Sequence, residues 1–162
     1  MGKKFNIVLV VILIAVIFIG CKRISSVVDT PKMQLDYTTD GNTVKELVNY
    51  GAASWNNGIN SFQSDSLHPL DSVGIILQIK KTESLKELKI SFSSMPTSYT
   101  VRRWEDSYIK NSDAYEKYYE IVGITDNAIT LPVDNKGYIY EVHAIWSQGN
   151  AYYAFYITNS NQ

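Results

Sequence analysis

The sequence predicts an all-β protein whose main domain is an antiparallel β-sandwich of about seven short strands. Two observations lead to this fold class. Apolar residues after position 70 come in short runs bounded by turn residues, which is typical of strands rather than helices. The stretch Tyr138–Trp146 also alternates between an all-apolar face and a mixed face, as a half-buried antiparallel strand requires.

The first twenty residues have the layout of a secretory signal. Lys3 and Lys4 give a positive start, and Ile7–Gly20 then runs for fourteen residues without a polar side chain. A helix that spans a bilayer needs about 20 apolar residues, so this run is short for a permanent span. Gly20 is the small residue that precedes Cys21, the single cysteine of the chain.

The four residues Phe18-Ile19-Gly20-Cys21 resemble the lipobox of bacterial lipoproteins, although that family prefers Leu where this chain has Phe18. The resemblance implies a diacylglycerol on Cys21 and cleavage before it, which would place the protein on the extracytoplasmic face of the cell membrane. Stable anchoring usually takes more than one acyl chain, and a diacylglycerol supplies two. The alternative is a plain signal anchor with an incidental cysteine.

Composition sets the domain plan. We expect a signal peptide over 1–20, lipidated Cys21 and a flexible tether over 21–42, and one domain over 43–162. Cleavage before Cys21 leaves 142 residues with 13 basic and 16 acidic side chains. Nucleic-acid binders carry a basic patch or stripe, so this composition predicts no nucleic-acid partner.

Each element of the domain has its own signal. Residues 43–50 fit a short helix or a first strand equally well, and residues 51–63 fit an edge strand or a loop. We expect two hairpins, one through Asp126-Asn127 and one through residues 147–150. The predicted strands are Val73–Lys80, Leu88–Phe92, Tyr99–Trp104, Tyr118–Thr125, Ala128–Val133, Tyr138–Trp146 and Ala151–Thr158.

Alternation assigns faces to the last two strands. Tyr138, Tyr140, Val142, Ala144 and Trp146 are predicted to face the core, with Ile139, Glu141, His143 and Ile145 outside. Burying an unpaired charge such as Glu141 would cost several kcal/mol (about 2–7 even for a neutral polar group). On the last strand, Tyr152 and Tyr156 are expected to be exposed.

The stretch Leu131–Tyr140 resembles the turn and following strand of immunoglobulin-like domains, with Tyr138 as the corner tyrosine and Tyr140 in place of the usual cysteine. More broadly, the chain resembles a family of uncharacterised lipoproteins of low-GC Gram-positive bacteria over about 49–158. The resemblance is carried by Ser54-Trp55, DSLHPLD at 65–71, VRRW at 101–104 and YIYEVHAIWSQGNAYYAF at 138–155. It implies a fold and a compartment, and no activity.

The segment Asp65–Asp71 has the densest set of reactive side chains. It contains two carboxylates, Ser66 and His68. A metal site would need His68 and His143 close together with carboxylates, since zinc takes three or four protein ligands. A Ser66–His68 nucleophile and base would still lack an oxyanion site. The simpler interpretation is a turn at Asp65-Ser66, with His68 at a strand end and Pro69 fixing the entry to the next strand.

Six side chains are candidates for ligand contact: Tyr152, Tyr156, Arg102, Arg103, Glu141 and His143. Alternation places the two arginines on opposite faces, so one of them at most serves any single patch. The sequence thus predicts a non-enzymatic binding or adaptor module with no cofactor, bound to the membrane through Cys21. Its partner is an unknown protein or a cell-wall component. The alternatives are a module for wall glycan or wall polymer and, less favoured, a metal-dependent hydrolase.

Overall fold

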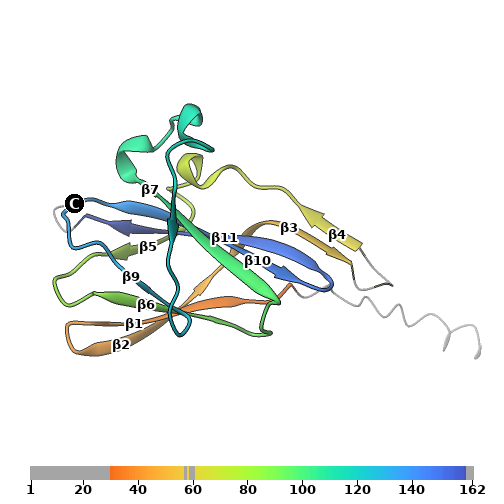
Figure 1. Cartoon of the computed structure of the whole chain (residues 1–162), viewed down its shortest axis with the longest axis horizontal. Coiled ribbons are helices and arrows are strands. Elements are labelled where there is room, and N and C mark those ends of the chain that lie inside the picture. Colours follow the sequence, from red (N-terminus) through yellow and green to blue (C-terminus); the bar gives the residue numbers. More distant parts are fainter. Residues whose placement is uncertain (1–29, 57, 59–60, 160–162) are drawn as a thin grey trace, which may run out of the picture.

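The structure is a computed structural model that describes residues 30–56, 58 and 61–159. It is an all-β sandwich of two sheets, one with four strands and one with seven. Figure 1 shows the course of the chain through these strands. The predicted fold class is confirmed, with eleven strands in the described residues where about seven were expected. Within these residues, no helix is long and apolar enough to cross a membrane. The predicted signal peptide and Cys21 lie outside the described residues.

The smaller sheet has the order β2-β1-β6-β9. The larger has the order β4-β3-β11-β10-β7-β8, and β5 adds to β11 as the one parallel pair among the described strands. The first strands are β1 (Met33–Thr39), β2 (Asn42–Val48), β3 (Tyr50–Asn56), β4 (Ser61–Ser64), β5 (Leu77–Lys80) and β6 (Glu87–Phe92). The remaining strands are β7 (Ser98–Glu105), β8 (Glu120–Val122), β9 (Ala128–Thr130), β10 (Tyr138–Trp146) and β11 (Gly149–Thr158).

The tether predicted for 21–42 is wrong from residue 33 onward. Met33 and Leu35 of β1 are fully buried, and the strand pairs with both β2 and β6. Asp40-Gly41, which falls within the predicted tether, is the two-residue turn of the β1–β2 hairpin. Both residues have positive φ, as the tightest hairpin turns require. Residues 43–50, left open between helix and strand, are mainly β2.

Two other predicted strands are shorter or paired differently. Residues 73–76 of the expected strand Val73–Lys80 form a turn, and the strand proper is β5. Asp126-Asn127 does turn the chain, with positive φ at both residues and a bridge between Thr125 and Ala128. The expected hairpin on either side of it is wrong, because β8 joins the larger sheet and β9 joins the smaller one.

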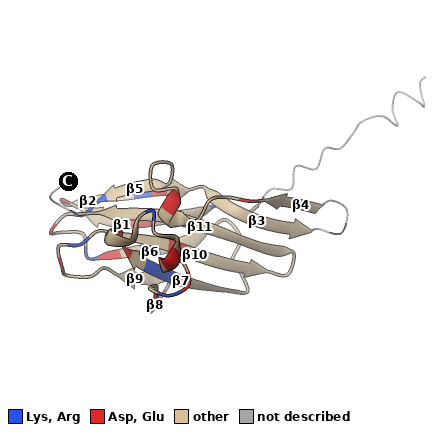
Figure 2. Ribbon diagram, turned by 90° about the horizontal axis from the view of Figure 1, so that it is seen from above, with Lys and Arg blue, Asp and Glu red and all other residues tan. Residues whose placement is uncertain are grey.

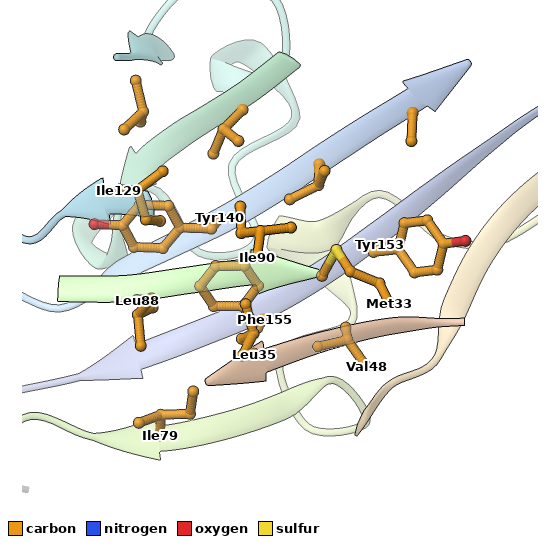
Figure 3. Close-up of a cluster of buried hydrophobic side chains, with 14 of the residues drawn as sticks. Met33, Leu35, Val48, Ile79, Leu88, Ile90, Ile129, Tyr140, Tyr153 and Phe155 are labelled. Atoms are coloured by element: carbon orange, nitrogen blue, oxygen red, sulfur yellow. The ribbon is translucent and has the colours of Figure 1, made fainter. Parts of the chain in front are cut away.

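The main core lies between the sheets. The five residues predicted to face inward on β10 are all in it, as are Tyr153, Phe155 and Ile157 of β11. Figure 3 shows Tyr140 and Phe155 side by side among aliphatic side chains from both sheets. Their rings stack with centroids 5.0 Å apart. Aromatic side chains thus supply much of the apolar area that a chain without disulfides must bury.

Tyr138 closes the corner before β10, where the immunoglobulin-like resemblance placed it. Its hydroxyl donates to the carboxylate of Asp134, at 2.6 Å, instead of to nearby backbone. The Arg103 guanidinium lies over the Tyr138 ring at 4.9 Å. The corner therefore combines a charge-assisted hydrogen bond with a cation–π contact.

A second, smaller core covers the outer face of the larger sheet at one end. Its buried residues are Trp104, Ile139 and Tyr156 of the sheet, with Leu70 and Ala114 from the covering loops. These loops contain three short 3₁₀ turns, η1 (Pro69–Asp71), η2 (Asp106–Tyr108) and η3 (Ser112–Ala114), which lie above the ribbon of the sheet in Figure 1. Trp104 is 1% exposed there and donates from Nε1 to the carbonyl of Ala114. This face is therefore covered at one end, although the alternation on β10 predicted an outside face.

Candidate functional site

A pocket of about 500 Å³ opens where two strands share one edge of β11. β3 pairs with the first half of β11 as far as Tyr50↔Tyr153, and β5 pairs with the second half from Leu77↔Phe155. Ala154 lies between the two pairings and lines the pocket. The volume is within the range of about 300–1,000 Å³ that small-molecule sites occupy.

Apolar side chains dominate the walls and the rim. Leu67 and Ile75 are 64% and 84% exposed, and both line the pocket. Exposed apolar side chains gathered around a concave site mark an interaction surface more often than isolated ones do. The apolar lining residues are Leu47, Tyr50, Ala52, Leu67, Pro69, Ile75, Ile76, Leu77, Tyr152 and Ala154.

Two charged residues among the described residues line the pocket, and they form an ion pair. Both carboxylate oxygens of Glu141 accept from Nη2 of Arg102, each at 3.2 Å. Glu141 is 3% exposed, so the prediction that it lies on a solvated face is wrong. Burial raises the pKa of its carboxyl, while the Arg102 charge acts in the opposite direction.

Aromatic rings hold Arg102 in place. Its guanidinium lies over Trp104 at 5.0 Å and over Tyr119 at 5.3 Å. Its Nη1 also reaches the exposed carboxylate of Glu116 at 3.5 Å. Arg102 is therefore preorganised at the pocket by cation–π contacts and carboxylates, with its charge balanced before any ligand arrives.

His68 lines the pocket from the loop before η1. Its Nδ1 accepts from the N–H of Leu70, so the neutral ring carries its proton on Nε2. Within the described residues this buried Nε2 has no hydrogen-bond partner. The ring stacks on Tyr115 at 3.7 Å and meets Trp104 edge-on. Burial, together with the charge of Arg102, lowers the pKa of His68.

His143 lies beside the pocket without lining it. It faces Tyr152 across the β10–β11 pair, and the two rings stack with centroids 4.1 Å apart. Burial and the Arg102 charge also lower its pKa. Tyr152 does line the pocket, and it is half-buried where an exposed ring was predicted.

The other two candidate residues lie elsewhere. Tyr156 is 5% exposed in the second core, and its hydroxyl donates to Asp106, so the prediction of an exposed ring is wrong. Arg103 lies on the opposite face from Arg102 and binds Glu120 through Nε and Nη2. The predicted alternation of the two arginines is thus confirmed, and only Arg102 reaches the pocket.

The segment Asp65–Asp71 contributes Ser66, Leu67, His68 and Pro69 to the pocket wall. His68 caps a 3₁₀ turn rather than a strand end. Among the residues that the structure describes, no group of three or more His, Cys, Asp or Glu side chains is placed to hold a metal ion.

Of the six candidate residues, Arg102, Glu141 and Tyr152 line the pocket. The sequence did not indicate most of its aliphatic walls. Leu47, Ile75 and Ile76 are ordinary apolar residues, and only the close approach of distant segments makes them neighbours. Comparison with family models, curated proteins and solved structures found no match to this chain. The function of this chain is therefore inferred from its own residues.

Proposed function

We propose that this protein is a lipid-anchored lipoprotein outside the cytoplasmic membrane and that its domain is a non-enzymatic binding module for a small molecule. The observation that carries the proposal is the pocket of about 500 Å³, with apolar walls around the ion pair of buried Glu141 and partly exposed Arg102. Ligand sites typically combine mostly apolar walls with a few fixed polar groups. The charged residues nearby are already paired, which favours binding over chemistry.

The membrane anchor is proposed from the sequence Phe18–Cys21 alone. Cys21→Ala removes the thiol that would carry the lipid. We expect wild-type protein in the detergent phase of a cell extract and the variant released or mislocalised. If Cys21→Ala partitions as firmly as the wild type, the N-terminal segment is a signal anchor instead.

The pocket is tested with a neutral apolar dye such as Nile red and the full chain in a mild detergent below the concentration that forms micelles. We expect saturable binding of one dye per chain. Leu67→Asp places a charge at the rim and should abolish it. Val133→Asp is the matched control, because Val133 is 90% exposed and does not line the pocket. Equal dye binding by both variants would refute a binding pocket at this place.

The exposed rim also fits an adaptor role, in which a partner protein inserts a side chain into the pocket. Leu47 and Tyr50 are 60% and 41% exposed beside Leu67 and Ile75. Cross-linking in intact cells followed by mass spectrometry distinguishes the two roles. An adaptor predicts one protein partner, captured by the wild type and by Val133→Asp and absent with Leu67→Asp. A wall-polymer module predicts wall fragments instead.

A further inference from the structure

The Glu141–Arg102 ion pair leaves some donor and acceptor positions of the two side chains unused. A carboxylate offers about four acceptor positions and a guanidinium five N–H donors. The two oxygens of Glu141 both use a single nitrogen of Arg102. Within the described residues, the only other hydrogen bond of the Arg102 side chain is the 3.5 Å contact to Glu116. Acceptors on Glu141 and donors on Arg102 therefore remain for a ligand.

The charges favour a ligand that carries both a donor and an acceptor. The lining charges of Arg102 and Glu141 cancel, and a buried pair with bonds unmade is a costly arrangement. A simple anion at Arg102 would lie against Glu141, with the Glu116 carboxylate also close. A simple cation at Glu141 would lie against Arg102. A ligand with an ammonium beside a carbonyl oxygen satisfies both partners at once.

The side chains that line the pocket indicate the chemical character of the rest of that ligand. Five of the lining residues are the branched aliphatic side chains Leu47, Leu67, Ile75, Ile76 and Leu77. Contact with such walls removes apolar area of the ligand from water, which is favourable. The walls therefore favour a bulky apolar side chain attached close to the polar group.

We propose that the pocket recognises an α-ammonium group next to a carbonyl oxygen, on a ligand with a bulky apolar side chain. The ammonium donates to Glu141, the carbonyl or carboxylate oxygen accepts from Arg102, and the side chain packs against the aliphatic wall. Free apolar amino acids and the N-termini of short apolar peptides share this unit. The inference rests on the proposed function, since it assigns a ligand class to the same pocket.

Isothermal titration calorimetry of the full chain in detergent tests the inference with four small probes. Leucine and leucyl-leucine amide contain the whole unit, and we expect at least one of them to bind. Nα-acetyl-leucine amide lacks the ammonium and isopentylamine lacks the carbonyl, so both should bind at least tenfold more weakly. Binding of leucine alone identifies a free amino acid, and binding of the dipeptide amide alone identifies a peptide N-terminus.

Glu141→Gln keeps the shape of the side chain and removes its charge. A hydrogen bond to a charged group contributes about 1.5–3 kcal/mol, so we expect affinity to fall roughly tenfold to a hundredfold. Glu116→Gln is the matched control, because Glu116 also contacts Arg102 but does not line the pocket. Where Glu141→Gln fails to fold, Arg102→Lys tests the same contact, since Lys keeps the charge and loses the planar fork.

The outcomes separate this inference from the proposed function. Equal affinity for leucyl-leucine amide and Nα-acetyl-leucine amide, which lacks the ammonium, would overturn the inference. Nile red bound by the wild type and lost with Leu67→Asp, without competition from leucine or leucyl-leucine amide, would also overturn it while leaving the binding pocket in place. Absence of dye binding by the wild type would contradict both the proposed binding pocket and this inference.

Discussion

Glu141 of β10 and Arg102 of β7 are direct partners in the register of the larger sheet, and on its outer face the buried Glu141 carboxylate pairs with the partly exposed Arg102 guanidinium. The pairing of the strands thus fixes the pairing of the charges. Figure 2 shows that much of the rest of the ribbon is uncharged, with acidic and basic segments mixed rather than separated. Among the described residues, Glu141 is the one charged residue that is buried.

Arg102→Met leaves the Glu141 carboxylate buried without its partner. Removing one member of a buried pair costs about 3–5 kcal/mol, which we expect in urea unfolding at neutral pH. Burial already raises the pKa of Glu141, and loss of Arg102 raises it further. Because a raised folded-state pKa favours the protonated form, the loss should shrink as pH falls toward the ordinary carboxyl pKa of about 4.3.

The control for that experiment is the double variant Arg102→Met/Glu141→Leu. It replaces both charges with apolar groups and should be more stable than Arg102→Met alone at neutral pH. A cost below about 1 kcal/mol for the single variant would mean that water already reaches the carboxylate.

β1 is part of the domain, so replacing one of its buried side chains should destabilise the folded protein. Leu35 is fully buried, and Leu35→Ala should lower the free energy of unfolding by about 2–5 kcal/mol. Val133→Ala is the exposed control and should change stability by no more than about 0.5 kcal/mol. If Leu35→Ala is as stable as the wild type, β1 does not contribute to the domain, and the predicted tether over 21–42 is supported instead.

The hydrogen bond at the Tyr138 corner can be tested by removing a single oxygen atom. Tyr138→Phe removes the hydroxyl that donates to Asp134 and should cost about 1 kcal/mol. Burial acts to raise the pKa of Asp134, but this hydrogen bond, together with nearby lysines, holds that pKa below its usual value. The contribution is present above the ordinary Asp pKa of about 3.9 and is lost as pH falls through the lower folded-state pKa. Unfolding curves of the two proteins should therefore converge in acid.

Gly149 begins β11 where a side chain has no room. A Cβ there would overlap the carbonyl oxygen of Ser54 and approach Trp55 Cα to 2.9 Å. Because backbone has to move, Gly149→Ala should cost more than about 2 kcal/mol in thermal or urea unfolding. Gly123→Ala is the matched control, with nothing within 4 Å of its added Cβ, and should stay within about 0.5 kcal/mol. Similar losses in both would contradict the tight β3–β11 pairing.

Because the two histidine rings are partly buried, we expect the folded protein to lose stability in mild acid. Burial and the charge of Arg102 lower the pKa of His68 and His143, so the folded state binds fewer protons than the unfolded chain. Stability should therefore fall as pH drops from the ordinary histidine pKa of about 6.5 through the lower folded-state values. Urea unfolding between about pH 7.5 and 5.5 measures the slope.

The double variant His68→Asn/His143→Gln is expected to flatten that slope. Asn can still cap η1, since its side-chain oxygen can accept from the N–H of Leu70 as Nδ1 of His68 does. The opposing effect of Glu141 is common to both proteins and cancels in the difference. An identical slope in the variant would assign the pH dependence to other groups.

Local signals were sufficient for the fold class and the last hairpin. Tyr138–Trp146 and the strand after it were predicted with the correct core face, because alternation and a short turn are properties of neighbouring residues. β1 carries the same alternation, Met33, Leu35 and Tyr37 against polar neighbours. Pro31 and Asp40-Gly41 led to its interpretation as a tether.

Local signals did not give the partner of each strand. Asp126-Asn127 makes a turn in either arrangement, yet β8 and β9 join different sheets. Strand pairing depends on contacts between residues far apart in the chain, and a turn alone does not specify them.

By itself, the sequence determined that short alternating strands would form a sandwich, since a strand with one apolar face must bury it. Only the tertiary structure decided the site. Alternation correctly put Glu141 and Arg102 on the face away from the main core, and from sequence alone that face belongs to solvent. The loops that contain η1 and η3 cover part of it, so Glu141 is buried at the pocket and Arg102 is only partly exposed there. The cost of burying a charge is met by a partner on another strand, and only the fold brings that partner into place.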